Sequence, residues 1–158
     1  MMNFLFTDWL LAGLGLLMVY MGVRDWQTHI IKNWIVLTVM AGAVAFWIAT
    51  QTPLWPDLAI RLGVALGVFV LLAIAHRFGM MGGGDVTVAA ALTLWFTPSG
   101  TVRFLILMSI IGAVVTLIVW LRHKRLKKEG IAEVPYGVAI ALAVIWLLTQ
   151  RFLNHFAG

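Results

Sequence analysis

Two aspartates, Asp25 and Asp85, are the residues of this chain best suited to carry chemistry. The chain has only six carboxylates, and these two lie beside apolar stretches. An ionised carboxylate there costs roughly 2.5–3.5 kcal/mol at the centre of a membrane helix and less toward its ends. Asp85 directly follows Gly82, Gly83 and Gly84, which lack side chains and permit positive φ, so another backbone can approach closely. Two carboxylates held close together share a proton, so one can activate water while the other polarises a peptide carbonyl.

The composition is that of an integral membrane protein. The 158 residues are 63% hydrophobic and 11% charged, with a mean hydropathy of +1.02, far above an ordinary soluble domain. At about 20 apolar residues per spanning helix, five or six helices use nearly the whole chain. We therefore expect an all-α polytopic membrane protein with a single domain over residues 1–158, embedded in the lipid bilayer.

Several functional classes are excluded by the same composition. The net charge is +5, but its excess is concentrated in one loop, and no soluble basic face is left to bind nucleic acid. The chain has no cysteine, which excludes disulfides, thiolate catalysis and cysteine-rich zinc sites. The four histidines are scattered without metal-ligand spacing. We expect neither a metal nor a cofactor.

Apolar runs bounded by charge, proline or glycine predict six transmembrane helices. They cover residues 9–23, 34–50, 57–75, 79–97, 102–121 and 135–153. The fourth has only about a dozen apolar residues beyond Asp85, roughly 18 Å of helix, so we expect it to begin within the membrane boundary. Trp26, Trp34, Trp55 and Trp95 are predicted to mark helix ends at the membrane interface.

The basic residues predict the orientation of these helices. Eight lie in the loops after the first, third and fifth helices, namely Arg24, Lys32, Arg77, Arg122, Lys124, Arg125, Lys127 and Lys128. The opposite side has three, Arg61, Arg103 and Arg151. Because basic loops stay in the cytoplasm, both termini are predicted to lie outside. Asp25, Asp85 and the segment 135–137 then share the cytoplasmic membrane surface.

The aspartates and glycines resemble those of a known family. Gly82-Gly83-Gly84-Asp85 is similar to the Gly-x-Gly-Asp motif of intramembrane aspartyl proteases. The surrounding sequence resembles the short, six-helix branch of type IV prepilin peptidases used in Tad-type (Flp) pilus assembly. Upstream, Asp25, Ile31 and Asn33 keep the places of the catalytic aspartate and the Ile-Pro-Asn segment of that family, with Lys32 in place of proline.

A third similar segment opens the last predicted helix, and the resemblance thereby covers essentially the whole chain. Val134-Pro135-Tyr136-Gly137-Val138 resembles the segment at the start of the last helix in the family. The resemblance implies an aspartic endopeptidase that cleaves prepilin leaders at the cytoplasmic face of the bacterial inner membrane. Asp25 and Asp85 would be catalytic, with water as the nucleophile. Longer relatives add N-methylation and a zinc-binding cysteine domain, and this chain lacks the cysteines.

The same residues have other interpretations. Asp85 could cap the fourth helix, and Asp25 could neutralise Arg24 at the membrane surface. Asn33 could cap the second helix without a catalytic step. The segment 135–137 could have a purely structural role, in which it starts a helix and allows close packing between helices.

Two alternative functions also remain. A small transporter or channel component would use the two aspartates to bind a proton or cation, although such acids more often lie at mid-membrane. A related membrane aspartyl protease would act on another client, such as an archaeal preflagellin.

Overall fold

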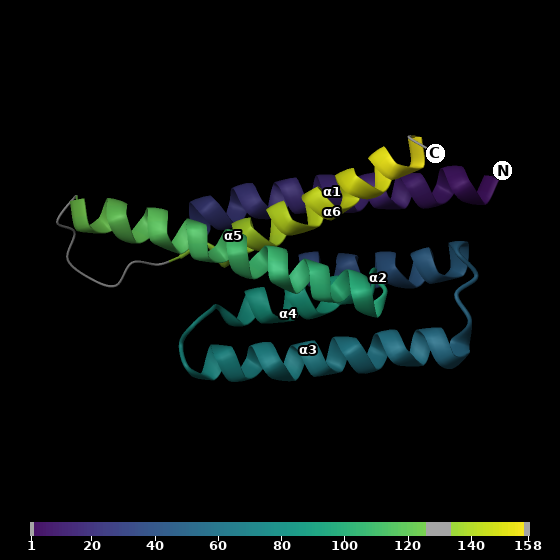
Figure 1. Ribbon diagram of the computed structural model, residues 1–158, viewed down its shortest axis with the longest axis horizontal. Coiled ribbons are helices and arrows are strands. Elements are labelled where there is room, and N and C mark those ends of the chain that lie inside the picture. Colours follow the sequence, from purple (N-terminus) through teal and green to yellow (C-terminus); the bar gives the residue numbers. More distant parts are fainter. Residues whose placement is uncertain (1, 126–133, 157–158) are drawn as a thin grey trace.

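The computed structural model describes residues 2–125 and 134–156, and every regular element within these ranges is a helix (Figure 1). The helices are α1 Met2–Thr28, α2 Asn33–Ala49, α3 Ala59–Arg77, α4 Gly83–Thr93, α5 Pro98–Arg125 and α6 Tyr136–Phe156. An irregular turn at Leu54–Leu58, in which Trp55 is extended with φ −135°, leads into α3. Each predicted helix overlaps an observed one, and the predicted all-α class is confirmed. Lys127 and Lys128 of the predicted basic loop lie outside the described residues.

Four helical segments in the described ranges are long and apolar enough to cross a membrane. They are Phe6–Thr28, Leu54–Arg77, Pro98–Arg125 and Tyr136–Leu153. The apolar helix α2 has 17 residues and α4 has 11, so they extend about 26 and 17 Å, less than the ~30 Å hydrocarbon core. The predicted span at 79–97 shrinks to α4 because residues 79–82 form a connection and Leu94–Phe96 continue as a tight turn before Pro98.

The short helix α4 lies inside the bundle. It packs against α2, α3 and α6, and most of its residues are buried. The buried set is Asp85, Val86, Val88, Ala89, Ala90, Ala91, Leu92 and Thr93. Small residues let neighbouring helices approach closely. Because protein rather than lipid surrounds α4, this helix need not reach the length of a full span.

The C-terminal end of α4 is attached to α2 by two indole hydrogen bonds. Trp95 donates from Nε1 to the Val39 carbonyl at 3.0 Å, and Trp47 donates from Nε1 to the Leu94 carbonyl at 2.9 Å. Gly42 makes room for this contact, since a Cβ there would lie 2.7 Å from the Trp95 ring. Trp95 is only 4% exposed, so it faces neighbouring helices rather than lipid. A buried indole needs an acceptor for its N–H, and the α2 backbone supplies it.

The outer surface of the bundle is apolar. Leu16, Leu37 and Leu66 are large side chains that project from α1, α2 and α3 with well over half of their surface exposed. Trp26 and Trp34 are also exposed, as predicted for interfacial residues. Such an outer surface suits contact with lipid and, together with the four long helices, indicates a multi-pass membrane protein.

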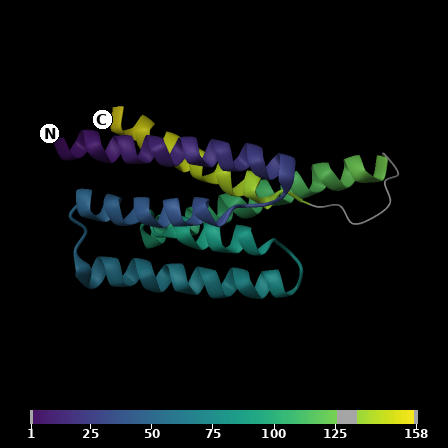
Figure 2. The same ribbon diagram turned by 180° about the vertical axis from the view of Figure 1, so that it is seen from behind.

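The two ends of the bundle hold different parts of the chain (Figures 1 and 2). One end, called here the aspartate end, has the α1–α2 connection at 29–32, the α3–α4 connection at 78–82 and the start of α6. The other, called the terminal end, has the N- and C-terminal ends of the chain and the α2–α3 connection. Alternation of helix direction therefore brings the last turn of α1 and the first turns of α4 and α6 to one end.

Candidate active site

Asp25 lies in the last turn of α1 and faces the start of α6. Its side chain is only 3% exposed, and its Oδ2 accepts a hydrogen bond from the Val138 backbone N–H at 3.3 Å. Gly137 lies directly against this carboxyl group, because a Cβ at that position would be 2.7 Å from both Cγ and Oδ2 of Asp25. Only glycine lets the α6 backbone come so close. The N–H of Val138 thus holds the Asp25 carboxyl group against α6.

Asp85 is the third residue of α4, and its two carboxyl oxygens have different surroundings. Oδ2 accepts a hydrogen bond from the Gly82 backbone N–H at 3.1 Å, which is the carboxylate half of a capping box. The alternative capping role is therefore present, although Asp85 sits inside the first turn and Gly82 is the N-cap. Oδ1 is buried and has no hydrogen-bond partner among the described residues. One oxygen thus holds the helix start, and the other is available to a proton or a reacting group.

The three glycines before Asp85 do not serve the same purpose. A Cβ at Gly82 would lie 2.9 Å from Oδ2 of Asp85, and one at Gly84 would lie 3.1 Å from the Ile31 Cβ. Gly83 faces only the His76 ring at an ordinary 3.6 Å. The expected close approach is therefore found at Gly84, where α4 meets the α1–α2 connection. The expected positive φ is not found at these glycines, because Gly82 has φ −71° and none of the three lies in the left-handed region.

The two aspartates interact electrostatically at the aspartate end. Asp85 lies outside the four long spans. Its pKa is raised to about 7, first by burial and second by the negative charge of Asp25, while the Gly82 N–H opposes the rise. A like charge has this effect when the two groups lie near each other. The structure thus brings together two acids that lie on different helices and far apart in the sequence.

The other predicted site residues take three different positions. Pro135 is buried immediately before α6, and Tyr136 packs its ring against Gly112 of α5. Asn33 is exposed as the first residue of α2, with Lys32 at the N-cap. The Lys32 side chain makes no capping hydrogen bond. Asn33 is the first residue inside the helix and not its N-cap, so the capping role suggested for Asn33 is not seen. Asn33 does not reach the aspartates through any described contact.

His76 is a residue of this site that the sequence did not indicate. Its Nδ1 is 2.8 Å from the Met81 carbonyl, and its ring rests against Gly83. The hydrogen bond ties the last turn of α3 to the glycine segment that precedes Asp85. A lone histidine at a helix end carries no spacing signal, so only the structure could reveal this contact.

An apolar groove opens beside the glycine segment. It is about 610 Å³ in volume and lies between α3, α5 and the start of α6, with Met81 and Tyr136 among its lining residues. Met108, Ala113 and Trp120 line it along α5. Met81 and Tyr136 precede Gly82 and Gly137 in the sequence, so the groove borders the two glycines that contact the acids, although neither acid lines it.

The fold and the site together define a multi-pass helical membrane protein with a coupled acid pair at one end. Within the described residues, no group of three histidine, aspartate or glutamate side chains could hold a metal ion. The chain matches the type IV leader peptidase family over residues 12–117, a stretch that contains both aspartates and the glycines. No curated protein and no solved structure matches it.

Because the matched stretch is more than half of the chain, this protein belongs to the type IV leader peptidase family. Membership makes it a protease and implies a substrate of the prepilin type. The resemblance at the level of the family is thus confirmed. The match ends before α6, so Gly137 and Val138, which contact Asp25, lie beyond it.

Proposed function

We propose that this chain is an aspartic endopeptidase that removes the leader peptide of Flp-type prepilins in a Tad pilus system, with Asp25 and Asp85 as its catalytic pair. The observation that carries the proposal is the burial of both carboxyl groups at the same end of the bundle, close enough for the charge of one to raise the pKa of the other. A shared proton between two such acids is the working state of an aspartyl protease.

The surroundings of each acid suggest its step. Asp25, whose Oδ2 is held by the Val138 N–H, takes a proton from water. Protonated Asp85 hydrogen-bonds the scissile carbonyl through the oxygen that has no other partner. Water adds to the carbonyl carbon, the amide nitrogen then receives a proton, and the C–N bond breaks. No cofactor enters these steps. Asp25 passes the proton taken from water to the amide nitrogen, and the tetrahedral intermediate returns one to Asp85, so the acid pair ends as it began.

We also propose that the whole chain forms one peptidase domain that crosses the bacterial inner membrane six times, with both termini outside and the acids at the cytoplasmic face. The basic residues Arg24, Lys32 and Arg77 support this orientation because they lie at the aspartate end. The shortness of α4 is compatible with a crossing, because neighbouring helices rather than lipid cover it.

The apolar groove supports a substrate with a hydrophobic segment beside its cleavage site. Met81 and Tyr136, which line it, are sequence neighbours of glycines that contact the acids, and its wall follows α5 from Met108 to Trp120. A prepilin helix that follows the leader would lie along this groove, while the scissile bond reaches the acids at the aspartate end.

The test is leader cleavage in membranes that co-express a Flp-type prepilin. Asp25→Asn and Asp85→Asn should each abolish cleavage and leave membrane insertion intact. Asp8→Asn is the matched control, since it removes a carboxylate from the N-terminal part of α1 and should cleave normally. Full processing by either variant of the pair would disprove its catalytic role.

A further inference from the structure

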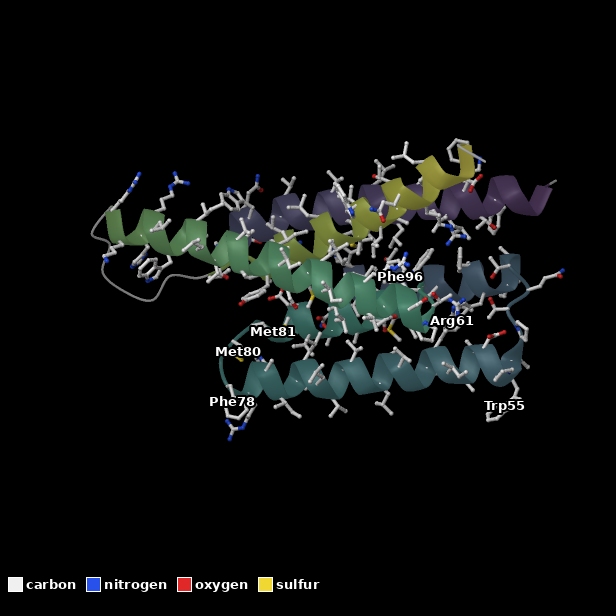
Figure 3. All side chains as sticks on the ribbon, in the orientation of Figure 1. Trp55, Arg61, Phe78, Met80, Met81 and Phe96 are labelled. Atoms are coloured by element: carbon white, nitrogen blue, oxygen red, sulfur yellow. The ribbon has the colours of Figure 1, made fainter. Side chains whose placement is uncertain are left out.

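The three arginines of the terminal end come together from three helices. Arg61 lies on α3, Arg103 on α5 and Arg151 on α6. The guanidinium of Arg61 donates to the Phe96 carbonyl at 3.3 Å, and both residues lie far from Met80 and Met81 in Figure 3. Arg61 and Arg151 are close enough for their charges to repel each other. Arg151 thus lies near Arg61 and shares a cavity lining with Arg103, although α3, α5 and α6 are far apart in the sequence.

A cavity of about 310 Å³ opens beside these arginines, and its lining has two parts. Arg103, Arg151 and Gln150 supply the polar part, and no acidic side chain is among the described lining residues. The rest of the wall is mostly apolar and includes Leu147 and Leu148 of α6. The guanidinium of Arg151 also lies 5.5 Å from the centre of the Phe46 ring, which orients it at the cavity edge.

This pairing of guanidinium groups with an apolar wall has a definite chemical preference. Arginine binds phosphate oxygens with paired hydrogen bonds, and two arginines without a lining carboxylate leave a positive charge to be neutralised. Basic pockets between membrane helices are suited to lipid phosphates. A free inorganic ion would leave the apolar wall without a contact, whereas the upper part of an acyl chain would pack against it.

We propose that this cavity at the terminal end binds one anionic phospholipid, with its phosphate between Arg103 and Arg151 and an acyl chain along Leu147 and Leu148. The site lies at the opposite end of the bundle from Asp25 and Asp85. It is independent of the peptidase proposal, because neither the acids nor the groove contributes to it.

Native mass spectrometry of the full chain in detergent tests this proposal. The protein is purified from vesicles of phosphatidylcholine with one fifth phosphatidylglycerol, and the lipids that remain bound are counted. We expect one retained phosphatidylglycerol per chain. Arg103→Gln with Arg151→Gln should lose it, and each single substitution should weaken binding about tenfold, the effect of one charge-assisted hydrogen bond pair.

The matched control is Arg122→Gln with Arg125→Gln, which removes two positive charges from the end of α5 at the aspartate end. In detergent there is no charged leaflet to attract, so this variant should keep its lipid. Equal loss in both double variants would overturn the proposal. So would equal retention of phosphatidylcholine, or displacement of the lipid by millimolar inorganic phosphate, which would show a site for free anions.

A second measurement separates lipid binding from misfolding. Phosphatidylglycerol should raise the melting temperature of the native protein more than phosphatidylcholine does, and this difference should vanish in the double glutamine variant. Arg103→Lys with Arg151→Lys keeps the charge and should recover part of the difference. If the native protein shows no preference between the two lipids, the proposal fails regardless of how the variants fold.

Discussion

Gly137 of α6 lies against the carboxyl group of Asp25 so closely that a Cβ at position 137 would be 2.7 Å from the Asp25 Cγ. The same stretch of α6 donates the Val138 N–H to Asp25. Position 137 therefore sets both the place of this acid and its hydrogen bond. The packing of α6 against α1 thus determines the position of the Asp25 carboxyl group in the site.

Gly137→Ala should reduce leader cleavage strongly. The added methyl group must displace the Asp25 carboxyl or the α6 backbone, and a displacement of about 1 Å at a catalytic group costs about 100-fold in rate. The rate at which purified protein in detergent cleaves a prepilin measures this loss. Gly67→Ala is the control, because a Cβ at Gly67 of α3 meets nothing within 4 Å. Equal activity of the two variants would contradict the assigned contact.

Gly84→Ala and Gly83→Ala should separate the glycines that precede Asp85. The first pushes on Ile31 at 3.1 Å, and the second meets the His76 ring at an ordinary 3.6 Å. We expect about a tenfold loss for Gly84→Ala and little change for Gly83→Ala, measured as kcat/KM. Each tenfold corresponds to about 1.4 kcal/mol of lost transition-state stabilisation.

A second substitution tests the cause of that loss. Ile31→Gly should restore part of the activity of Gly84→Ala, because it removes the Cβ atom that the new methyl group meets. Additive effects in the double variant would show that the contact between α4 and the α1–α2 connection is not responsible.

Cleavage should fall as the pH rises through about 7. The proposed mechanism needs protonated Asp85, and its raised pKa of about 7 means that the proton is lost in this range. Below that pH Asp85 keeps its proton, so the group that polarises the carbonyl stays in its active form. A profile of kcat/KM from about pH 5 to 9 measures this. Activity that keeps rising to the alkaline limit would contradict the assignment.

The coupling of the acids can be measured without cleavage. Asp25→Asn removes a negative charge beside Asp85, so the pKa of Asp85 should fall from about 7, although burial keeps it above the usual range. Infrared titration of isotope-labelled aspartate carboxyl groups reports it directly. An unchanged titration of Asp85 would mean that the two acids do not interact.

Ala113→Phe should impair cleavage by filling the apolar groove, whereas Val114→Phe should not. Ala113 lines the groove, while its neighbour Val114 is 52% exposed and does not. The substrate would lose its place along α5, so we expect KM to rise at least severalfold, with kcat less affected. Kinetics with a series of prepilin concentrations separates the two. Matching KM values in both variants would exclude the groove as a substrate site.

The positions of the helices and the placement of both acids at one end of the bundle could be predicted from the sequence. Apolar runs between charged, proline and glycine breaks located each helix, and alternation of direction placed Asp25 and Asp85 at one end. The length of α4 could not be predicted in this way. Apolar residues look the same whether they face lipid or other helices, so the run at 79–97 did not show that its middle is covered by protein.

The details of the site depended on contacts that sequence patterns do not encode. The burial of Trp95 follows from an acceptor on Val39, and the place of His76 follows from the Met81 carbonyl. Both acceptors are backbone carbonyls, and every residue has one, so no residue type in the sequence points to these contacts. The separate surroundings of the two Asp85 oxygens likewise arise from the Gly82 N–H.

The enclosure of α4 has a consequence for how the protein responds to its membrane. Since α2, α3 and α6 pack against this helix and two indoles hold its far end, a thicker or thinner bilayer would press on the outer helices first. Asp85 is thereby insulated from the acyl chains around it. One such protein could work in membranes whose fatty-acid content changes with growth temperature.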